Sequence, residues 1–413
     1  MNKKWTWSKM LLAAAAVALL ISGSTLFAAK GGGGKPPKDD PPPPPAELPD
    51  VRYEIKFIEL PANATGTPSP YVNEINNLGQ VVGNYSAEDG ERAFFFDGVQ
   101  AIDLNAIVTA GLPDGWRLRS ALAINDWMVV VGNIEKIGSD PIETRPIAID
   151  LAAVNPVVDL LPDVGVVFGL TAGYRINENG DILGIYELAD GIWGAWFFNP
   201  GLYDGDPEVR DLRDGIPQDM SDESPDPLLI PFRGLDLSLN NPVGDSRAQV
   251  AGDVDHVPFR YTLGDAEPEW FPEVDLVLWV GGLNDSGTFC GLHRGPKIKG
   301  KIKVDPFRFD ESLETSLELL PTDNYQQPYG MNSWGDLLTS SYVYRDDWGW
   351  VKINDLVVGT DADMQAWSSG NAYVAYQNGI NDRGGLSLAG QIAGYFSDGR
   401  LFVLTPEPLA PTP

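Results

Sequence analysis

The chain has 413 residues and a formal net charge of −29 at pH 7, from 29 basic and 58 acidic side chains. A surface this negative repels nucleic acid and anionic membranes, so neither is an expected partner. Hydrophobic residues make up 43% and aromatic residues 10% of the chain, which is too apolar for a disordered protein and indicates a packed core.

The N-terminal 50 residues differ in composition from the rest. Three lysines precede an apolar run over residues 10–21, and small residues follow. This order predicts a signal peptide over residues 1–29, whose apolar core is shorter than the ~20 residues that span a bilayer. An uncleaved anchor is the alternative, because a bulky residue lies three positions before the expected cut. Residues 30–50 are rich in glycine and proline and predict a disordered linker, so we expect a secreted or periplasmic bacterial protein without a stable membrane anchor.

A short phrase recurs seven times between residues 70 and 395. It consists of an aliphatic residue, an Asn, often a second Asn or an Asp, then a Gly and a few β-forming residues that close on another Gly. The anchoring asparagines are Asn76, Asn125, Asn177, Asn240, Asn284, Asn332 and Asn381. Their mean spacing of about 51 residues is close to the kelch-type period. We interpret them as structural turn residues, because Asn tolerates and Gly prefers the positive φ of tight hairpins.

Each clean repeat contains four short strand-like runs. In the first repeat they cover residues 71–75, 80–85, 92–96 and 99–104. Four antiparallel strands make one propeller blade. The closing Gly of each phrase is expected near the end of the second strand, where a missing side chain allows close approach of two backbones.

The two ends of the repeat region complete each other. An alternating run over residues 52–60 precedes the first repeat, while the last repeat ends at Thr405 one strand short of a blade. Pairing of this run with the segment around Phe402 would close the ring and remove exposed sheet edges. The sequence therefore predicts an all-β, seven-bladed β-propeller over residues 51–405, closed by its N-terminal strand and followed by a Pro-rich tail over residues 406–413.

Few residue types for catalysis are present. The chain has two histidines and one cysteine, and the mature part has no zinc-protease His pair, Gly-x-Ser-x-Gly elbow or phosphate loop. We predict no catalytic residues. Cys290 is expected to be a small core residue. The aromatic runs at residues 193–198 and 348–350 could stack on sugars, but we expect both in third strands, packed between blades.

Two charged segments are candidate binding sites. Nine acids lie between residues 204 and 226, and Asp204, Asp206 and Glu208 could hold calcium, although a solvated acidic loop is the alternative. No other cofactor is expected.

The second charged segment is basic and consists of Arg294, Lys297, Lys299, Lys301 and Lys303. Alternation along a strand predicts that its lysines share one face, either to protect a sheet edge or to bind an anionic polymer.

The first repeat resembles the HAF repeat of bacterial extracellular proteins. The resemblance rests on Ile75-Asn76-Asn77-Leu78-Gly79-Gln80-Val81-Val82-Gly83 followed by Arg92-Ala93-Phe94, which stands at the place of the His-Ala-Phe triplet that names the repeat. It extends over about residues 71–404. It implies a secreted β-repeat protein and carries over no catalytic residue.

These observations favour a secreted, monomeric repeat propeller that acts as a non-catalytic binding or structural module. Its expected ligand is a carbohydrate, another extracellular polymer or a protein. A carbohydrate-active enzyme, a glycosidase or lyase with paired carboxylates, is the first alternative, since 58 acids neither exclude nor locate such a pair. An envelope scaffold without a small ligand is the second.

Overall fold

The computed structural model describes most of the repeat region and none of the N-terminal 48 residues. The described residues are 49–65, 70–140, 142–161, 171–187, 193–199, 208–211, 233–238, 249–254, 257–262, 269–271, 277–284, 286–298, 301–310, 317–320, 327–370, 372–374, 380–381 and 390–408. The predicted signal peptide and nearly all of the predicted linker therefore lie outside them. Within these ranges, no helix is both long and apolar enough to cross a membrane.

Seven antiparallel sheets, or blades, follow one another along the chain. Blade 1 contains β2 (Tyr71–Ile75), β3 (Val81–Ala87), β4 (Gly90–Phe96) and β5 (Ala101–Asp103). Blade 2 contains β6 (Trp116–Ile124), β7 (Val129–Lys136), β8 (Thr144–Asp150) and β9 (Val158–Leu160). Blade 3 contains β10 (Thr171–Ile176), β11 (Ile182–Glu187), β12 (Trp193–Asn199) and β13 (Glu208–Asp211).

Blades 4 to 6 repeat this order. Blade 4 contains β14 (Arg233–Ser238), β15 (Gln249–Val254), β16 (Val257–Thr262) and β17 (Glu269–Trp270). Blade 5 contains β18 (Val277–Leu283), β19 (Phe289–Ile298), β20 (Lys301–Phe309) and β21 (Leu317–Leu319). Blade 6 contains β22 (Pro328–Met331), β23 (Leu337–Thr339), β24 (Tyr342–Arg345) and β25 (Gly349–Lys352). The strands predicted for the first repeat are confirmed to within two residues at every boundary.

Blade 7 joins the two ends of the repeat region. Its strands are β27 (Ala372–Val374), β28 (Ile392–Phe396), β29 (Leu401–Pro408) and, as the fourth, β1 (Val51–Ile58). β1 pairs with β29 antiparallel, with Phe57 opposite Phe402, so the predicted closure is confirmed. The pairing continues to Pro408, three residues beyond the predicted end of the propeller, because Val51 is opposite that residue. A fifth strand, β26 (Val357–Val358), runs parallel to β1 on its open edge.

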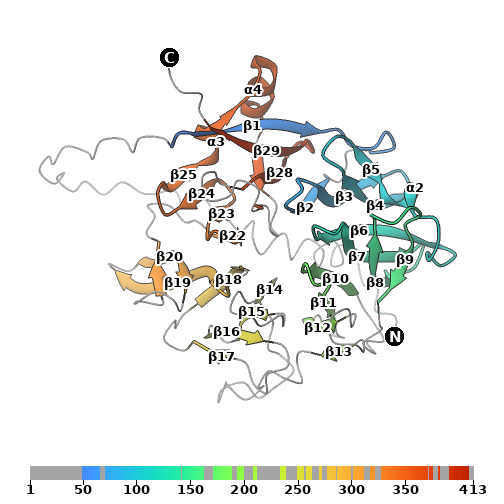
Figure 1. The fold of residues 1–413 in the computed structure, drawn as a ribbon, viewed down its shortest axis with the longest axis horizontal. Helices are drawn as coiled ribbons and strands as arrows, with labels where there is room; N and C mark the ends of the chain where they lie inside the picture. Colours follow the sequence, from blue (N-terminus) through green and yellow to red (C-terminus); the bar gives the residue numbers. More distant parts are fainter. Residues whose placement is uncertain are drawn as a thin grey trace, which may run out of the picture. The chain divides into compact units, whose positions relative to one another are not determined.

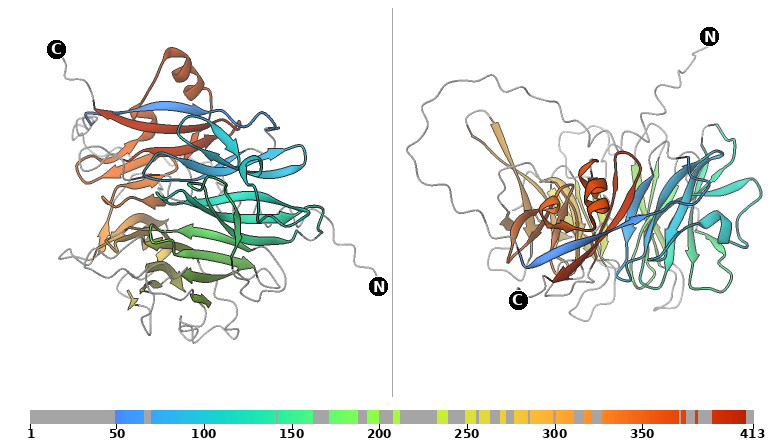
Figure 2. Two further views of the ribbon diagram at one scale, coloured as in Figure 1. Left: turned by 45° about the vertical axis from the view of Figure 1, so that its right-hand side comes forward. Right: turned by 90° about the horizontal axis from the view of Figure 1, so that it is seen from above.

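Within the described ranges, three short helices accompany the sheets: α2 (Leu104–Ile107), α3 (Ile353–Leu356) and α4 (Asp361–Ser368). The first strands of neighbouring blades contact one another, as β2 does with β6 and β18 with β22. They therefore lie innermost, and the blades follow one another around them (Figure 1). The turns between first and second strands open on one face, which we call the asparagine face. The turns between second and third strands open on the other, which we call the hairpin face (Figure 2).

The closing glycines lie opposite bulges in the first strands. The pairing of β2 with β3 shifts register between Val72 and Glu74, and Gly83 is opposite Val72. A Cβ on Gly83 would collide with the carbonyl oxygen of Tyr71 and with the ring of Phe94. The close approach of two backbones at this glycine was predicted, but its position within the second strand was not. Gly83 is the third of seven residues in β3, near its start, because the bulge in β2 and not the strand end creates the crowding.

Aromatic side chains fill the space between blades. Trp196 and Phe197 of β12 are buried, so the packing predicted for that run is confirmed for them. The prediction for residues 348–350 is wrong in its strand. β23 and β24 have only three and four residues, so the fourth strand already begins at Gly349 and contains Trp350, whose ring centroid lies 5.1 Å from that of Tyr344. Cys290 is fully buried, as predicted.

Candidate ligand-binding face

The repeat asparagines hold their own turns together on the asparagine face. Oδ1 of Asn76 accepts hydrogen bonds from the backbone N–H groups of Leu78 and Gln80, at 3.1 and 2.9 Å. The same pair of bonds recurs at Asn177, Asn284 and Asn332. Positive φ falls three residues later, on glycine in blades 1, 3, 5 and 6 and on Met128 in blade 2. The asparagine is therefore needed for its carboxamide, and the glycine supplies the backbone conformation.

The same carboxamides also link neighbouring blades. Nδ2 of Asn76 donates to the backbone carbonyl of Asn125, and Nδ2 of Asn125 donates to that of Asn177, both at 3.0 Å. Three further links run from Asn284 to Asn332 (3.4 Å), from Asn332 to Asn381 (3.3 Å) and from Asn381 to Asn76 (2.7 Å). The last of these crosses the closure between blade 7 and blade 1. Asn240 lies outside the described residues.

A second set of links involves the residue after each asparagine. Asp126 accepts hydrogen bonds from the backbone N–H of Asn77 at 2.8 Å and from its Nδ2 at 3.0 Å. Glu178 accepts the backbone N–H of Asp126 at 2.8 Å. Across blades 1 to 3, each turn is therefore fixed to the next by two successive residues. This face is a preorganised surface and not a set of independent loops.

Large apolar side chains stand at the third position of three of these turns. Trp127 is 67% exposed, Leu78 53% and Trp334 45%. The backbone N–H of Trp334 donates to Oδ1 of Asn332, so its indole projects from a turn that is internally fixed. Blades 6, 7, 1 and 2 are consecutive in the chain of asparagine links. The three side chains therefore occupy one part of the circle of turns.

One buried carboxylate lies beneath the Trp334 turn. Oδ2 of Asp336 accepts Nδ2 of Asn332 at 2.9 Å, and its Oδ1 lies 3.6 Å from Nε of Arg345. Burial raises the pKa of Asp336 to about 6, against the smaller opposing effects of Asn332 and Arg345. This carboxyl group therefore titrates in mildly acidic solution, within the same turn that carries the exposed Trp334.

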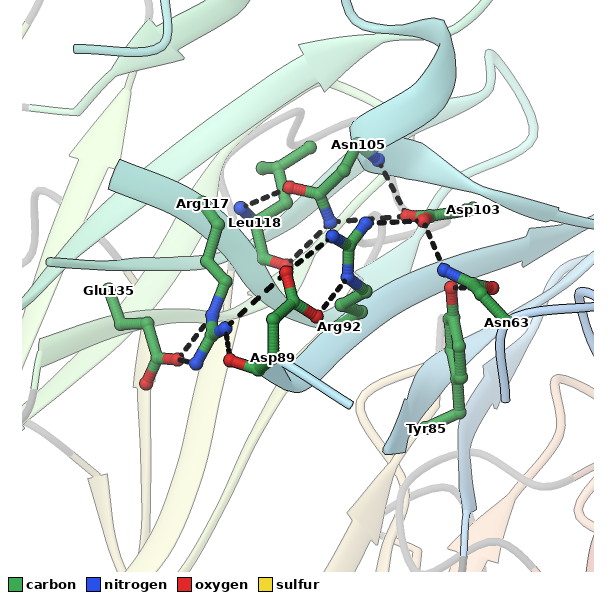
Figure 3. A network of polar contacts seen from close by, with 9 residues as sticks. All are labelled: Asn63, Tyr85, Asp89, Arg92, Asp103, Asn105, Arg117, Leu118 and Glu135. Carbon is green, nitrogen blue, oxygen red and sulfur yellow. Dashed lines mark hydrogen bonds and ion pairs between the residues drawn. The ribbon is translucent and has the colours of Figure 1, made fainter. Parts of the chain in front are cut away.

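The hairpin face of blades 1 and 2 carries a dense network of ion pairs (Figure 3). Arg92 lies 2.6 Å from both Asp89 and Asp103, and Arg117 pairs with Glu135 and donates to the backbone carbonyl of Asp89. The hydrogen bond from Arg92 lowers the pKa of Asp89. Each of these charges is matched within the network, and Arg117 of β6 reaches the β3–β4 turn of the neighbouring blade. We therefore assign it a structural role in joining blades 1 and 2.

The predicted basic segment forms the hairpin of β19 and β20. Lys303 and Arg294 are exposed, and Lys299 lies outside the described residues. The prediction that the lysines share one face is wrong. Lys297 is opposite Ile302 and Lys301 is opposite Ile298, because the ladder changes register between Arg294 and Lys297. Positions directly opposite in an antiparallel pair share a face, so this register separates the position of Lys297 from those of Lys301 and Lys303.

The predicted calcium site is only partly within the described residues. Asp204 and Asp206 lie outside them, and Glu208 is the first residue of β13. Among the residues that the structure describes, no group of three or more His, Cys, Asp or Glu side chains is arranged to hold a metal ion. Calcium binding by these three acids stays a prediction.

Sequence reasoning missed both the inter-blade role of the asparagines and the exposed indoles. A signal for the first was available, because all seven turns use Asn and none uses Asp or Gly at that position. Only a carboxamide both accepts the turn N–H groups and donates to the next blade. A signal for the second was the presence of tryptophan at turn positions that usually carry small or polar residues.

Neither a protein-family model nor a curated protein matches the sequence. Among solved structures, the chain is similar to the β-propeller domain of the Trilobed protease from Pyrococcus furiosus, with 9% identity and a TM-score of 0.46 over 84% of this chain and 100% of that chain. It is also similar to YCF48 bound to D1 peptide, with 11% identity and a TM-score of 0.41 over 84% of this chain and 96% of that chain. A puromycin-hydrolyzing peptidase of Mycobacterium tuberculosis is 14% identical over 75% of this chain and 47% of its own, with a TM-score of 0.41. At these scores the similarities carry no argument about function. The blade topology itself defines a seven-bladed β-propeller closed by its N-terminal strand.

Proposed function

We propose that the protein is an exported, non-catalytic module that binds an extracellular polysaccharide on the asparagine face. The observation that carries the proposal is the exposure of two indoles, Trp127 at 67% and Trp334 at 45%, at equivalent turn positions of blades 2 and 6. Sugar rings have an apolar C–H face that stacks on indole, while the indole N–H donates to a hydroxyl group. The leader pattern in the sequence supports export.

The fixed backbone of the turns supports binding over simple exposure. Because the asparagine carboxamides hold each turn and link it to the next, the indoles lose little backbone freedom when a ligand binds. The neighbouring Asn77, Asp126 and Glu178 place carboxamide and carboxylate groups beside them, which suits hydroxyl groups. Trp127 and Trp334 stand on blades that are separated by blades 7 and 1, so one short sugar cannot reach both. An elongated chain that also crosses Leu78 fits this arrangement.

Alanine variants of the two indoles test the proposal. The chain from Ala46 onward is titrated with a panel of polysaccharides while thermal shift and reducing-sugar release are recorded together. We expect Trp127→Ala and Trp334→Ala each to weaken the polysaccharide affinity about tenfold, which corresponds to about 1.4 kcal/mol. Val154→Ala is the matched control, because Val154 is 96% exposed in an outer turn of blade 2. Its affinity should equal that of the wild type.

Three results would count against the proposal. Wild-type affinity in the double variant Trp127→Ala/Trp334→Ala would remove the asparagine face as the binding site. Release of reducing ends would instead favour the carbohydrate-active enzyme. If no polysaccharide shifts the melting temperature of the wild-type chain, the envelope scaffold becomes the better account.

A further inference from the structure

The hairpin of blade 5 extends further than its counterparts. β19 has ten residues and β20 has nine, whereas the second and third strands of the other blades have at most eight. The ladder between them runs from the pair Phe289–Phe309 to the pair Ile298–Lys301. Seen from above, the two strands project past the strands beside them (Figure 2). Blade 5 therefore carries an extension beyond what the repeat requires.

Core packing explains only the first half of this hairpin. Phe289, Phe307 and Phe309 belong to the buried cluster of blade 5. β18 pairs with β19 no further than His293, and β21 pairs with β20 only at residues 307–309. The distal part is thus a two-stranded ribbon, which is marginally stable without a third strand or an apolar face to bury. We call it the basic ribbon and define it as residues 294–298 and 301–303.

The charge of the basic ribbon is opposite to that of the molecule. Of the seven lysines that follow residue 50, four lie between residues 297 and 303, in a chain with a net charge of −29. The Lys303 side chain is half exposed, with Nζ 2.9 Å from Oδ1 of Asp305, and Arg294 is exposed. Lys297 and Lys301 occupy out-of-phase positions on the two strands. Positive residues are therefore strung along the ribbon and do not converge on one point.

We propose that the basic ribbon is a docking element for a linear polyanion. Charges spaced along extended strands match an extended ligand with repeated anionic groups, whereas a single small anion requires several donors at one place. Lysine ammonium groups bind carboxylate and phosphate alike, so the shared chemistry is a chain of repeated carboxylates or phosphates. The ribbon extends from the hairpin face, opposite to the asparagine face, so this site is separate from the one proposed for the indoles.

Protection of an open strand edge is the competing explanation for these lysines. It requires no ligand, and it makes a different prediction for lysine-to-glutamine changes. If edge protection is their role, such a variant should self-associate. If docking is their role, the variant should stay monomeric and lose polyanion binding.

The test uses polygalacturonate and inorganic polyphosphate as probes of the two sources of negative charge. We expect the wild-type chain to bind at least one of them, with an affinity that falls as salt rises. Lys297→Gln/Lys301→Gln/Lys303→Gln should weaken that affinity at least tenfold and reduce its salt dependence. Lys136→Gln is the matched control, because Lys136 ends the equivalent strand of blade 2 and its side chain is 52% exposed. It should bind like the wild type.

Size-exclusion chromatography of the triple variant distinguishes the two explanations. No binding of either probe by the wild-type chain, or unchanged binding by a monomeric triple variant, would overturn the proposal. Self-association of the triple variant without a loss of affinity would assign the lysines to edge protection. Polyanion binding should persist in Trp127→Ala/Trp334→Ala, so failure at one face leaves the conclusion for the other intact.

Discussion

At the scale of single residues, one carboxamide performs two tasks that set the shape of the asparagine face. Oδ1 of each described repeat asparagine fixes its own turn, and Nδ2 reaches the carbonyl of the next blade in the five links described. These groups are buried, so an unmatched donor or acceptor there costs about 1–3 kcal/mol. A turn formed for local reasons alone would not require that second bond.

Asn125→Asp separates the two tasks. Aspartate still accepts the turn N–H groups, but its second oxygen faces the carbonyl of Asn177 and replaces an attraction with a repulsion. We expect the free energy of unfolding at pH 7 to fall by about 2–3 kcal/mol, measured by urea denaturation. Asn155→Asp, in an exposed turn of the same blade, should stay within about 0.5 kcal/mol of the wild type. Equal stability of the two variants would show that the asparagines act only within their turns.

Asp336 predicts an unusual pH dependence. Burial raises the pKa of this carboxyl group to about 6 in the folded protein, while its value in the unfolded chain is near 3.8. Between these two values the folded protein binds more protons than the unfolded chain, so its stability falls as pH rises. The resulting loss in the free energy of unfolding is on the order of 3 kcal/mol at most. The loss is measured as the difference in the free energy of unfolding between pH 4 and pH 7. Asp336→Asn should remove the part of this difference that comes from Asp336.

The exposed Asp347 provides the control, since it also pairs with Arg345, at 3.0 Å. Asp347→Asn should keep most of the pH dependence of the wild type, because burial raises the pKa of Asp336 more than the nearby charge of Asp347 does. If Asp336→Asn leaves the difference between pH 4 and pH 7 unchanged, Asp336 does not titrate in this range.

At the scale of elements, the sequence predicted the number of strands and blades, and it failed where the pairing register or the length of a strand decides the position of a residue. Strand number, blade number and the closing strand follow from local periodicity and turn residues. The β2 bulge depends on how β2 and β3 pair, and a bulge changes register without changing composition. The same cause misplaced the lysines, since the β19 bulge adds a residue that alternation cannot show. Trp350 was assigned to the wrong strand because the second and third strands of blade 6 have only three and four residues, which moves the fourth strand forward along the sequence.

At the scale of the whole molecule, the pairing of β1 with β29 closes the ring of seven blades, and the closed ring has two separate faces. Eight residue pairs join β1 to β29, and the link from Asn381 to Asn76 reinforces the same junction near the centre. The asparagine face presents indoles on fixed turns, and the opposite face presents ion pairs and the basic ribbon. High negative charge favours solubility and opposes self-association, so a monomer stays the prediction.

Hydroxyl-radical footprinting with mass spectrometry, with and without the polysaccharide that gives the largest thermal shift, tests the central claim most directly. The two indoles should be oxidised readily in the free protein because they are exposed. We predict that the ligand protects Trp127 and Trp334, while the exposed outer residue Val154 reacts at an unchanged rate. Protection confined to the hairpin face, with both indoles still fully reactive, would contradict the proposal that the asparagine face holds the ligand.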